Sequence, residues 1–497
     1  MKRAALWLLL STPVLGCTSP EETFEFTLHL NVAGDDLLLS DLDALSVEID
    51  VPDGQSVQQE WDPFDSEATL EVPEVPRGEG IIIRLEGVVA RGTAEQQLAS
   101  GESAPLDLPE MEEAWVLFHR HPALVRLEGG ADEPRLGHKV FAVEGGAVVV
   151  GGETGDGYAP ISQLVRTERS GYVLEEVDAG PEHSGFSAAL IRGGELEGQI
   201  FIAGGATSVD TFTGVTDEYH VWDPIEGEYT VEGEQLDEPR YGAVAAALSD
   251  ASDGAVSLVG GIYHSTFLST DFTDWVQTVD PDGGDTELAN LNRKAWMHGA
   301  NTWGPDTVVV CGGYVSTPFD GYVASDRCDQ VFPGSGDVTT EFELLQQGRA
   351  AHRTVNIGPD LDELLLVGGT GETLSSTPPL DVTDGALDTA EIVSHDGSSF
   401  QSSALISMVH PRIHPLVLRL PDEGRVLVCG GHDGISLRAD CEFYDEASGE
   451  FSEAIGLTLP SPVFLAEGAA LDDGTALIVG GDLGGTEPAD MAVIYLP

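Results

Sequence analysis

Basic residues are scarce in this 497-residue chain. It contains 22 Lys and Arg against 86 Asp and Glu, which gives a formal net charge of −64 at pH 7. Phosphate-binding surfaces need clustered Lys and Arg, so this composition argues against nucleic acid or an anionic membrane surface as a partner. The acidic residues are spread along the chain rather than gathered in a tail, which indicates a solvated acidic surface.

The sequence also lacks long segments with the apolar periodicity of helices. Glycine is abundant, at 60 residues, and aromatic residues are ordinary, at 7%. This combination is typical of an all-β chain with many tight turns. There is no HExxH pattern, no glycine-rich phosphate loop that opens a helix and no nucleophile elbow, so no catalytic residue is predicted.

What the chain does contain is a short apolar run, rich in β-branched residues, that ends in two glycines and recurs seven times. The first glycines of the pairs are Gly151, Gly204, Gly260, Gly312, Gly368, Gly430 and Gly480. The period is about fifty residues, the length of a four-stranded propeller blade. Such a run has strand length, and the glycines allow a turn with positive φ and a close neighbouring strand.

Residues 119–497 resemble kelch repeats, in which an Arg-led first strand precedes an apolar strand ending in Gly-Gly and a third strand with Tyr-Asp or a similar pair. The matching segments include Pro134-Arg135-Leu136-Gly137-His138, Pro239-Arg240-Tyr241-Gly242, Tyr219-His220-Val221-Trp222-Asp223 and Cys441-Glu442-Phe443-Tyr444-Asp445. Two repeats depart from the pattern, at Glu182-His183 and Pro462-Val463. The resemblance implies a seven-bladed kelch-type β-propeller.

The last repeat has room for three strands. Its third strand would be 491–495, and the orphan strand 123–127 lies just before the first repeat. We predict that 123–127 completes the last blade and closes the ring, because closure buries the sheet edges that an open array exposes.

The N-terminus resembles that of a bacterial lipoprotein. Lys2 and Arg3 precede the apolar stretch 4–15, which has the length of a secretory signal and is too short to span a bilayer. The sequence Val14-Leu15-Gly16-Cys17 resembles a lipobox. The alternative is an ordinary signal peptide followed by an incidental cysteine.

The lipobox resemblance implies that residues 1–16 are a signal peptide and that 17–22 form a lipidated tether. Cys17 would carry the acyl chains, palmitate among them, and several chains together anchor a protein permanently. Thr18 stands where an inner-membrane retention signal has Asp. The resemblance therefore implies the bacterial outer membrane, on its periplasmic or its cell-surface side.

Residues 23–118 are predicted to form a small antiparallel β-sandwich of the immunoglobulin or prealbumin kind. Segments 24–30 and 45–51 alternate with period two, and 68–72, 81–85 and 114–118 are further candidate strands. No motif there carries chemistry. We interpret this domain as a spacer that holds the propeller off the membrane, with a binding module as the alternative.

Four cysteines occupy equivalent positions in two repeats. Cys311 and Cys429 precede glycine pairs, and Cys328 and Cys441 begin the following third strands. Antiparallel neighbours hold facing Cα atoms about 4.5–5.5 Å apart, within reach of a disulfide, so we predict the bridges Cys311–Cys328 and Cys429–Cys441. An exported location favours oxidation. Zinc is the alternative, disfavoured because paired histidines are missing from these repeats.

Arginine and histidine recur at the openings of the repeats. The arginines are Arg135, Arg240, Arg293, Arg349 and Arg412, and the histidines are His138, His298, His352 and His414. One interpretation is a ring at the channel mouth that holds a carboxylate or sulfate of a ligand. The other is that these side chains tie loops and backbone carbonyls between blades.

One further segment has the acidic spacing of a calcium loop, with Asp280, Asp282 and Asp285. It falls where a turn between third and fourth strands is expected, and we favour the plain turn. Beyond this calcium candidate, no cofactor and no metal site are predicted.

Two hypotheses of function follow. The first is a lipid-anchored protein whose propeller is a non-catalytic binding or scaffold module for a protein or glycan on its loop face. The second is an exported carbohydrate-active enzyme, because kelch propellers are similar in fold to sialic acid mutarotases and galactose-oxidase-type copper enzymes. A mutarotase-like site would use channel Arg, His and Glu. The oxidase version needs a free cysteine, which the predicted bridges do not leave. A purely structural surface protein is a third possibility.

Overall fold

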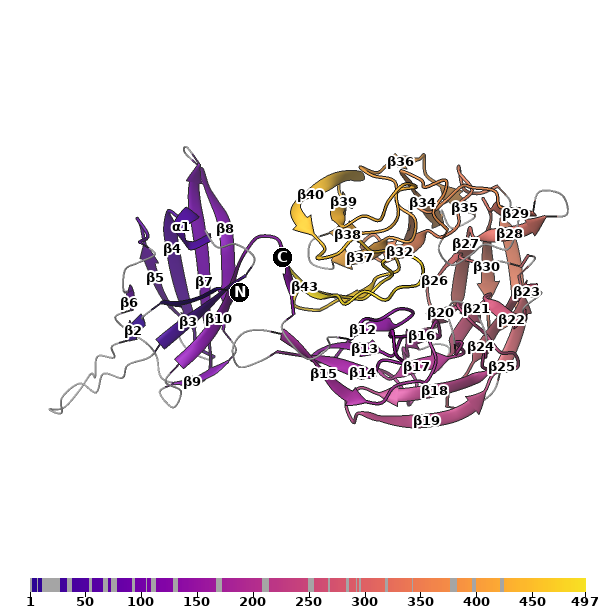
Figure 1. Cartoon of the computed structure of the whole chain (residues 1–497), viewed down its shortest axis with the longest axis horizontal. Coiled ribbons are helices and arrows are strands. Elements are labelled where there is room, and N and C mark those ends of the chain that lie inside the picture. Colours follow the sequence, from indigo (N-terminus) through magenta and orange to yellow (C-terminus); the bar gives the residue numbers. More distant parts are fainter. Residues whose placement is uncertain are drawn as a thin grey trace. The chain divides into compact units, whose positions relative to one another are not determined.

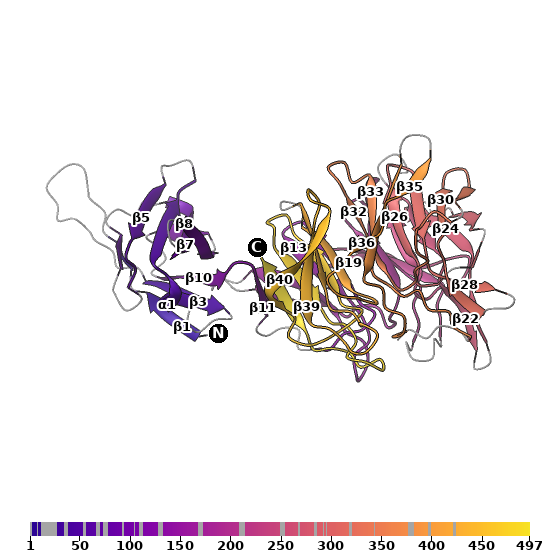
Figure 2. The ribbon, with the colours of Figure 1, turned by 90° about the horizontal axis from the view of Figure 1, so that it is seen from above.

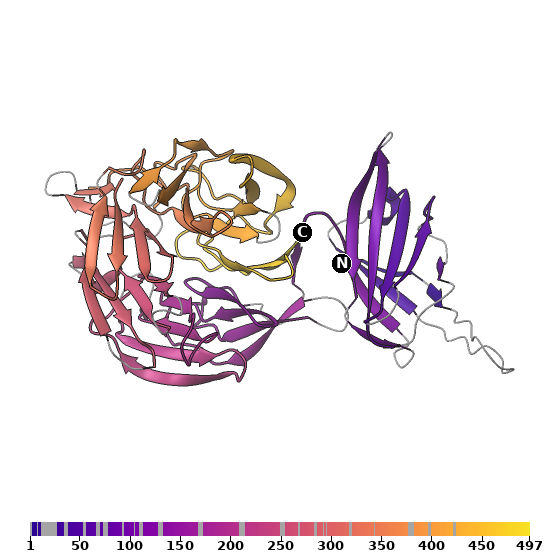
Figure 3. The same ribbon diagram turned by 180° about the vertical axis from the view of Figure 1, so that it is seen from behind.

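A computed structural model of the chain is almost entirely β-structure (Figures 1 and 3). It describes residues 2–6, 8–10, 27–33, 38–52, 56–65, 70–72, 78–91, 94–103, 105–108, 113–127, 133–166, 172–207, 214–248, 254–266, 269–282, 286–291, 293–294, 296–317, 321–341, 343–375, 382–395, 399–420 and 424–497. Within these residues the helix is one turn, α1 (Leu38–Asp41). No helix among them is long and apolar enough to cross a membrane. The all-β prediction is confirmed.

The chain divides into two compact units. The first comprises Met1–Gly130, Leu164–Leu174 and Ile494–Pro497, and the second comprises Ala131–Gln163 and Glu175–Val493.

The N-terminal region forms a curled sheet of order β1–β3–β10–β8–β7–β4–β5, with β9 paired to β7. Its strands are β1 (Lys2–Leu6), β3 (Thr27–Ala33), β4 (Ala44–Asp50), β5 (Val57–Trp61), β7 (Gly78–Arg91), β8 (Ala94–Glu102), β9 (Leu106–Leu108) and β10 (Glu113–Arg120). A separate short pair joins β2 (Leu8–Leu10) to β6 (Leu70–Val72). The long-sheet pairings are antiparallel except that β10 runs parallel to β3.

Period-two alternation explains this sheet. In β4, Leu45, Val47 and Ile49 are buried while their neighbours are half-buried, as expected for a strand with one face on a core. The predicted strands 81–85 and 114–118 fall within β7 and β10, and 45–51 matches β4 to within one residue at each end. The described parts of 24–30 and 68–72 fall on β3 and β6.

Residues 1–16 were predicted to be a signal peptide. In the full-length chain Lys2–Leu6 pairs with β3, and Leu8–Leu10 pairs with β6. Cleavage of the segment stays a prediction, and Cys17 with the whole of the predicted tether 17–22 lies outside the described residues.

Seven sheets fan around one axis to form a seven-bladed β-propeller (Figure 1). Blade 1 contains β12 (Lys139–Val143), β13 (Gly146–Val150), β14 (Ile161–Arg166) and β15 (Tyr172–Asp178); blade 2 contains β16 (Ser187–Leu190), β17 (Ile200–Ala203), β18 (Glu218–Asp223) and β19 (Glu228–Gln235). Blade 3 contains β20 (Val244–Ala247), β21 (Val256–Val259), β24 (Trp275–Val279) and β25 (Thr286–Asn290); blade 4 contains β26 (Gly299–Trp303), β27 (Thr307–Cys311), β30 (Cys328–Phe332) and β31 (Asp337–Glu341).

The remaining blades follow the same plan. Blade 5 contains β32 (Arg353–Ile357), β33 (Glu363–Val367), β34 (Thr389–His395) and β35 (Phe400–Ser402), with β36 (Ile406–Ser407) also on β34; blade 6 contains β37 (Leu416–Leu420), β38 (Arg425–Cys429), β39 (Asp440–Asp445) and β40 (Glu450–Thr458). Blade 7 has the order β11–β43–β42–β41, from β11 (Ala123–Arg126), β43 (Ala492–Leu496), β42 (Ala476–Val479) and β41 (Glu467–Ala470). The strand predicted to complete the last blade therefore lies beside β43.

The first strands line the axis. Each contacts the first strand of both neighbouring blades, in the circular order β12, β16, β20, β26, β32, β37, β41 and back to β12. The ring is thus continuous.

The glycine pairs are required by this packing. Their first glycines have φ between 51° and 68°, and their second glycines between 87° and 114°. A Cβ on Gly204 would lie 2.2 Å from the carbonyl oxygen of Arg240 in the next blade, and the N–H of Gly205 donates to that oxygen at 2.6 Å. Glycine is the residue that tolerates both the backbone conformation and the close approach.

Both predicted disulfides are present. Cys311 faces Cys328, with Cα atoms 4.1 Å apart, and Cys429 faces Cys441 at 4.2 Å. They close loops of 17 and 12 residues. In the chain-entropy model each bridge stabilises the fold by about 3 kcal/mol.

Candidate functional site

The loops that precede the first strands meet around a hollow at the mouth of the channel. Its volume is about 160 Å³, and all seven blades contribute to its wall. The apolar lining includes Leu136, Phe186, Tyr241, Val244, Trp296, Met297 and Leu465, and the polar lining includes Lys139, His298, His352, Arg353, His414 and Glu467. A concave apolar surface with a few polar groups is the usual form of a ligand site.

A ring of left-handed residues shapes the rim. The same position in each blade has positive φ: Gly137, Gly185, Gly242, Met297, Ala351, His414 and Leu465. In five of these links the N–H donates to the carbonyl of the preceding ring member, as from His414 to Ala351 at 2.9 Å. Four of the seven residues are not glycine, and a left-handed backbone costs such residues about 1–2 kcal/mol each. The hydrogen bonds between ring members hold the backbone in this conformation.

Three charged residues meet inside the hollow. The carboxylate of Glu467 accepts from Lys139 at 2.9 Å and from Arg353 at 3.1 Å. Each begins a first strand, in blades 7, 1 and 5 respectively. Burial alone would raise the pKa of Glu467, but the two cations outweigh it and lower this pKa to about 2. The carboxylate is therefore ionised and paired at neutral pH.

The five opening arginines are buried, at 0–7% exposure, and each guanidinium donates to the carbonyl of the first glycine in its own blade. The acceptors are Gly151 for Arg135, Gly260 for Arg240, Gly312 for Arg293, Gly368 for Arg349 and Gly430 for Arg412. These contacts fix the loop onto the second strand. None of the five arginines is among the described residues that line the hollow.

A second position, on the third strand, faces the arginine. It lies in register with the residue two before the first glycine and is Ser162, His220, Gln277, Asp329, Glu391 and Glu442 in blades 1 to 6. In blades 4, 5 and 6 the carboxylate pairs with the arginine at 2.9, 2.6 and 2.7 Å. In blade 1, Arg135 instead donates to the Ser162 hydroxyl at 2.7 Å.

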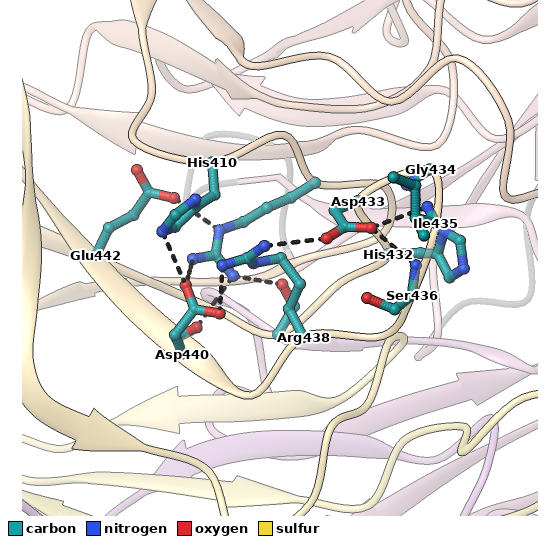
Figure 4. A network of polar contacts seen from close by, with 11 residues as sticks. His410, His432, Asp433, Gly434, Ile435, Ser436, Arg438, Asp440 and Glu442 are labelled. Atoms are coloured by element: carbon teal, nitrogen blue, oxygen red, sulfur yellow. Dashed lines mark hydrogen bonds and ion pairs between the residues drawn. The ribbon is translucent and has the colours of Figure 1, made fainter.

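Blade 6 extends its pair into a longer network (Figure 4). Asp440 pairs with Arg412 at 2.7 Å, with Arg438 at 2.8 Å and with His410 at 3.6 Å, and Arg438 reaches Asp433 at 3.0 Å. Asp433 also accepts the N–H groups of Ile435 and Ser436. Burial opposes ionisation of both acids, but these donors lower the pKa of Asp433 and of Asp440. The network fixes the loop after the blade 6 glycine pair.

The histidines at the openings are buried. His138 contacts the carbonyl oxygen of Val479 in the neighbouring blade at 3.1 Å. Burial lowers the pKa of His138 and of His298 to about 3, and it holds the pKa of His352 well below its usual value. His298, His352 and His414 line the hollow, whereas His138 is not among its described lining residues.

The sequence did not single out Lys139, Arg353 or Glu467. Their shared signal is a charged residue at the first position of a first strand, four residues after the opening arginine in Lys139 and Arg353. That signal becomes meaningful only when the ring brings blades 1, 5 and 7 together.

The calcium candidate is described in part. Asp280 accepts the N–H of Asp282 at 3.1 Å, as in a turn, and Asp285 lies outside the described residues. Among the residues that the structure describes, no three His, Cys, Asp or Glu side chains are arranged to hold a metal ion.

Comparison with known proteins identifies a fold but no family. No protein-family model and no curated protein matches the chain. Among solved structures, a fungal alcohol oxidase of the AA5 family in complex with copper has a TM-score of 0.52 at 14% identity, with 75% of each chain covered. The structure of YjhT has a TM-score of 0.45 at 14% identity, covering 63% of this chain and 93% of that one. Such low identity shows a shared fold alone, and that fold is a β-propeller.

Proposed function

We propose that this chain is a bacterial outer-membrane lipoprotein whose propeller binds a protein or glycan on its loop face without transforming it. The observation that carries the proposal is the state of the charged groups in the hollow. Glu467 is paired with two cations, and the neighbouring histidines have pKa values far below neutrality. General acid–base catalysis works best with a pKa near the working pH. These groups suit recognition better than proton transfer.

The binding test uses the full chain with Cys17→Ser, which removes the proposed acylation site, on glycan and protein arrays. A ligand of the hollow is expected to lose at least tenfold in affinity when Val244→Phe fills the wall. The matched control is Val177→Phe, since Val177 is exposed on the outer strand of blade 1. If both variants bound every ligand with equal affinity, the hollow would not be the binding site.

The membrane anchor has a separate test. The lipobox resemblance supports acylation of Cys17, and mass spectrometry of the membrane-extracted N-terminal peptide is expected to show acyl chains on a chain that begins at Cys17. Cys17→Ser is expected to release the protein from the membrane fraction. An unmodified Cys17 in membrane-bound protein would contradict the anchor while leaving the binding proposal intact.

An exported carbohydrate-active enzyme is the second candidate. The hollow favours a mutarotase-like form of it, because Arg, His and Glu side chains do line the channel. A copper-oxidase form fits less well, because all four propeller cysteines are bridged and the described donor side chains do not converge. Anomeric exchange of sialic acid followed by NMR, with copper analysis of the purified protein, distinguishes the candidates: turnover or stoichiometric copper would replace the binding proposal.

A further inference from the structure

Two neighbouring blades carry an additional hairpin on the loop face. In blade 3, β22 (Ile262–Thr266) pairs with β23 (Ser269–Phe272), and in blade 4, β28 (Tyr314–Thr317) pairs with β29 (Gly321–Ala324). Each hairpin follows directly after a glycine pair, in the connection between second and third strands. Figures 1 and 2 both place β22 and β28 at the same end of the propeller. Among the described residues these are the hairpins inserted at this point of a blade.

Aromatic contacts join the two hairpins to the channel rim. Phe272 of β23 stacks on Trp296 at 5.9 Å between ring centroids and meets Tyr322 of β29 edge to face at 5.6 Å. The N–H of Tyr322 also donates to the carbonyl of Leu374 in blade 5 at 2.7 Å. The hairpins are therefore fixed parts of the loop face.

A cavity of about 370 Å³ lies beside the blade 4 hairpin, and its charge is unusual for this chain. Arg293, Lys294 and Arg327 line it together with one acid, Asp326. The rest of the wall is Val315, Ser316, Thr317, Val323, Ala324 and Ser325. Acidic residues outnumber basic ones 86 to 22 over the whole sequence, and here that ratio is reversed. Its volume falls within the range of about 300–1,000 Å³ typical of small-molecule sites.

Two of these cations, Arg293 and Lys294, differ in their contacts. Arg293 is buried and committed, since it bonds to Asp329, to the carbonyl of Gly312 and to the carbonyl of Arg327. Lys294, one of three lysines in the sequence, is exposed. Its ammonium lies 6.0 Å from the ring centroid of Tyr263 on the blade 3 hairpin, and within the described residues it forms no ion pair. This ammonium can therefore pair with, and donate hydrogen bonds to, an anionic group of a ligand.

We infer that the pocket beside β28 and β29 (the hairpin pocket) binds the carboxylate of a small sugar acid. Lys294 supplies the charge, and the Ser316 hydroxyl can bond to a ring hydroxyl of the sugar. The Thr317 hydroxyl donates to the carbonyl of Gly321 at 3.4 Å and can accept a bond from a second ring hydroxyl. The Tyr263 ring, 6.0 Å from the ammonium, is a neighbour of Lys294 and is not among the residues that line the pocket. A single anionic group fits better than a polyanion, because the chain carries a net charge of −64 that repels extended anions. The inference rests on the proposed function in that the ligand is a glycan of the loop face.

The experiment measures galacturonate binding by calorimetry to the full chain with Cys17→Ser, against galactose, inorganic sulfate and inorganic phosphate. Galacturonate is expected to bind at least tenfold more tightly than the other three, because a charge-assisted hydrogen bond is roughly twice as strong as a neutral one and the ring contacts add to it. Lys294→Ala is expected to remove about 90% of that affinity, and Lys294→Arg to retain most of it. Arg192→Ala is the matched control, since Arg192 is an exposed cation in the loop between β16 and β17.

Several outcomes would overturn the inference. Equal losses for Lys294→Ala and Arg192→Ala would make the effect one of overall charge. If sulfate or phosphate bound as tightly as galacturonate, the sugar ring would contribute nothing to the affinity, and the inference of a sugar-acid site would be wrong. A neutral glycan whose affinity ignores Lys294 but falls with Val244→Phe would overturn the hairpin pocket and leave the proposed function standing, whereas failure of every ligand at both places would remove both.

Discussion

The arginine that opens a repeat faces a carboxylate in blades 4, 5 and 6, and a neutral residue in blades 1 and 3. All five guanidiniums nevertheless reach the first-glycine carbonyl of their own blade. Burial lowers the pKa of Arg135 and of Arg240 to about 10, so both stay charged at pH 7 without an acidic partner. Backbone carbonyls are thus the common element of the design, and the carboxylate is an addition.

Two other features distinguish later blades from blades 1 to 3. The left-handed rim position is glycine in blades 1 to 3 and carries a side chain in blades 4 to 7. The disulfides occur in blades 4 and 6. Blade 2 stands apart, because His183 occupies the arginine position and His220 the facing one, with ring centroids 6.5 Å apart. The later blades use more covalent and ionic cross-links to hold a less permissive backbone.

The largest expected effect is loss of an arginine whose carboxylate partner is buried. Arg412→Met leaves Glu442, 0% exposed, without its cation, and the propeller is expected to lose about 4 kcal/mol in guanidinium unfolding. Arg135→Met, which leaves Ser162 and carbonyls, is expected to cost about 2 kcal/mol. The double variant Arg412→Met/Glu442→Leu should recover most of the loss, and equal costs for the two single variants would erase the distinction between the blades.

The bridges come next. Replacing both members of one pair, as in Cys429→Ser/Cys441→Ser, is expected to lower the free energy of unfolding by about 3 kcal/mol in oxidising buffer. The blade 4 pair should give a similar value, because the two loops differ by only five residues, 17 against 12. Under fully reducing conditions, the serine variant and the unmodified protein should have the same free energy of unfolding. A remaining difference would show that the serine side chains themselves destabilise the fold.

Blade 2 should be one of the acid-sensitive repeats, together with the blades that carry His138, His298 and His352, whose pKa values are also lowered by burial. Burial lowers the pKa of His183 from 6.5 to about 4 and also lowers that of His220. A depressed pKa means that stability is complete above pH 6.5 and is lost as pH falls toward 4, by about 2 kcal/mol at pH 5 for His183 alone. Unfolding at pH 7 and pH 5 should therefore differ less in His183→Gln than in the unmodified chain. An unchanged pH dependence would contradict this.

The smallest expected effect concerns the rim. Ala351→Gly relieves about 1–2 kcal/mol of left-handed strain but adds about 0.5–1 kcal/mol of chain entropy, so a net gain of about 0.5 kcal/mol is expected. Gly185→Ala should destabilise instead, because its Cβ would lie 2.2 Å from the Tyr241 ring. Thermal unfolding measures both, and a loss in Ala351→Gly would mean that the side chain itself is needed there.

Much of the fold could be predicted from the sequence, because the residues that determine it form short patterns repeated in every blade. A glycine pair indicates a close approach in every blade, and cysteines at matching positions of adjacent strands indicate facing residues, so the bridges Cys311–Cys328 and Cys429–Cys441 could be predicted. The rim position did not, since Met297, Ala351, His414 and Leu465 carry no signature of positive φ. The hollow was also hidden: Lys139 and Glu467 are 328 residues apart and meet only through ring closure.

For the opening arginines, the sequence left two interpretations, and it could not choose because both need the same residue at the same place. The contacts to Gly151, Gly312 and Gly430 are those of loop fastening. The hairpin pocket was missed for a different reason. Lys294 follows Arg293 directly, and a single lysine beside an arginine does not predict a binding site. The site exists only because the inserted hairpin of blade 4 lies next to this lysine.

Each disulfide joins two strands of the same blade, so neither described disulfide crosses from one blade to the next. Under mechanical load the seven blade interfaces would part while blades 4 and 6 each kept a locked segment. The 17-residue segment in blade 4 would withhold roughly 60 Å of extension until it was reduced. A chain pulled from both ends would then extend in steps whose length depends on whether the two disulfides are intact or reduced.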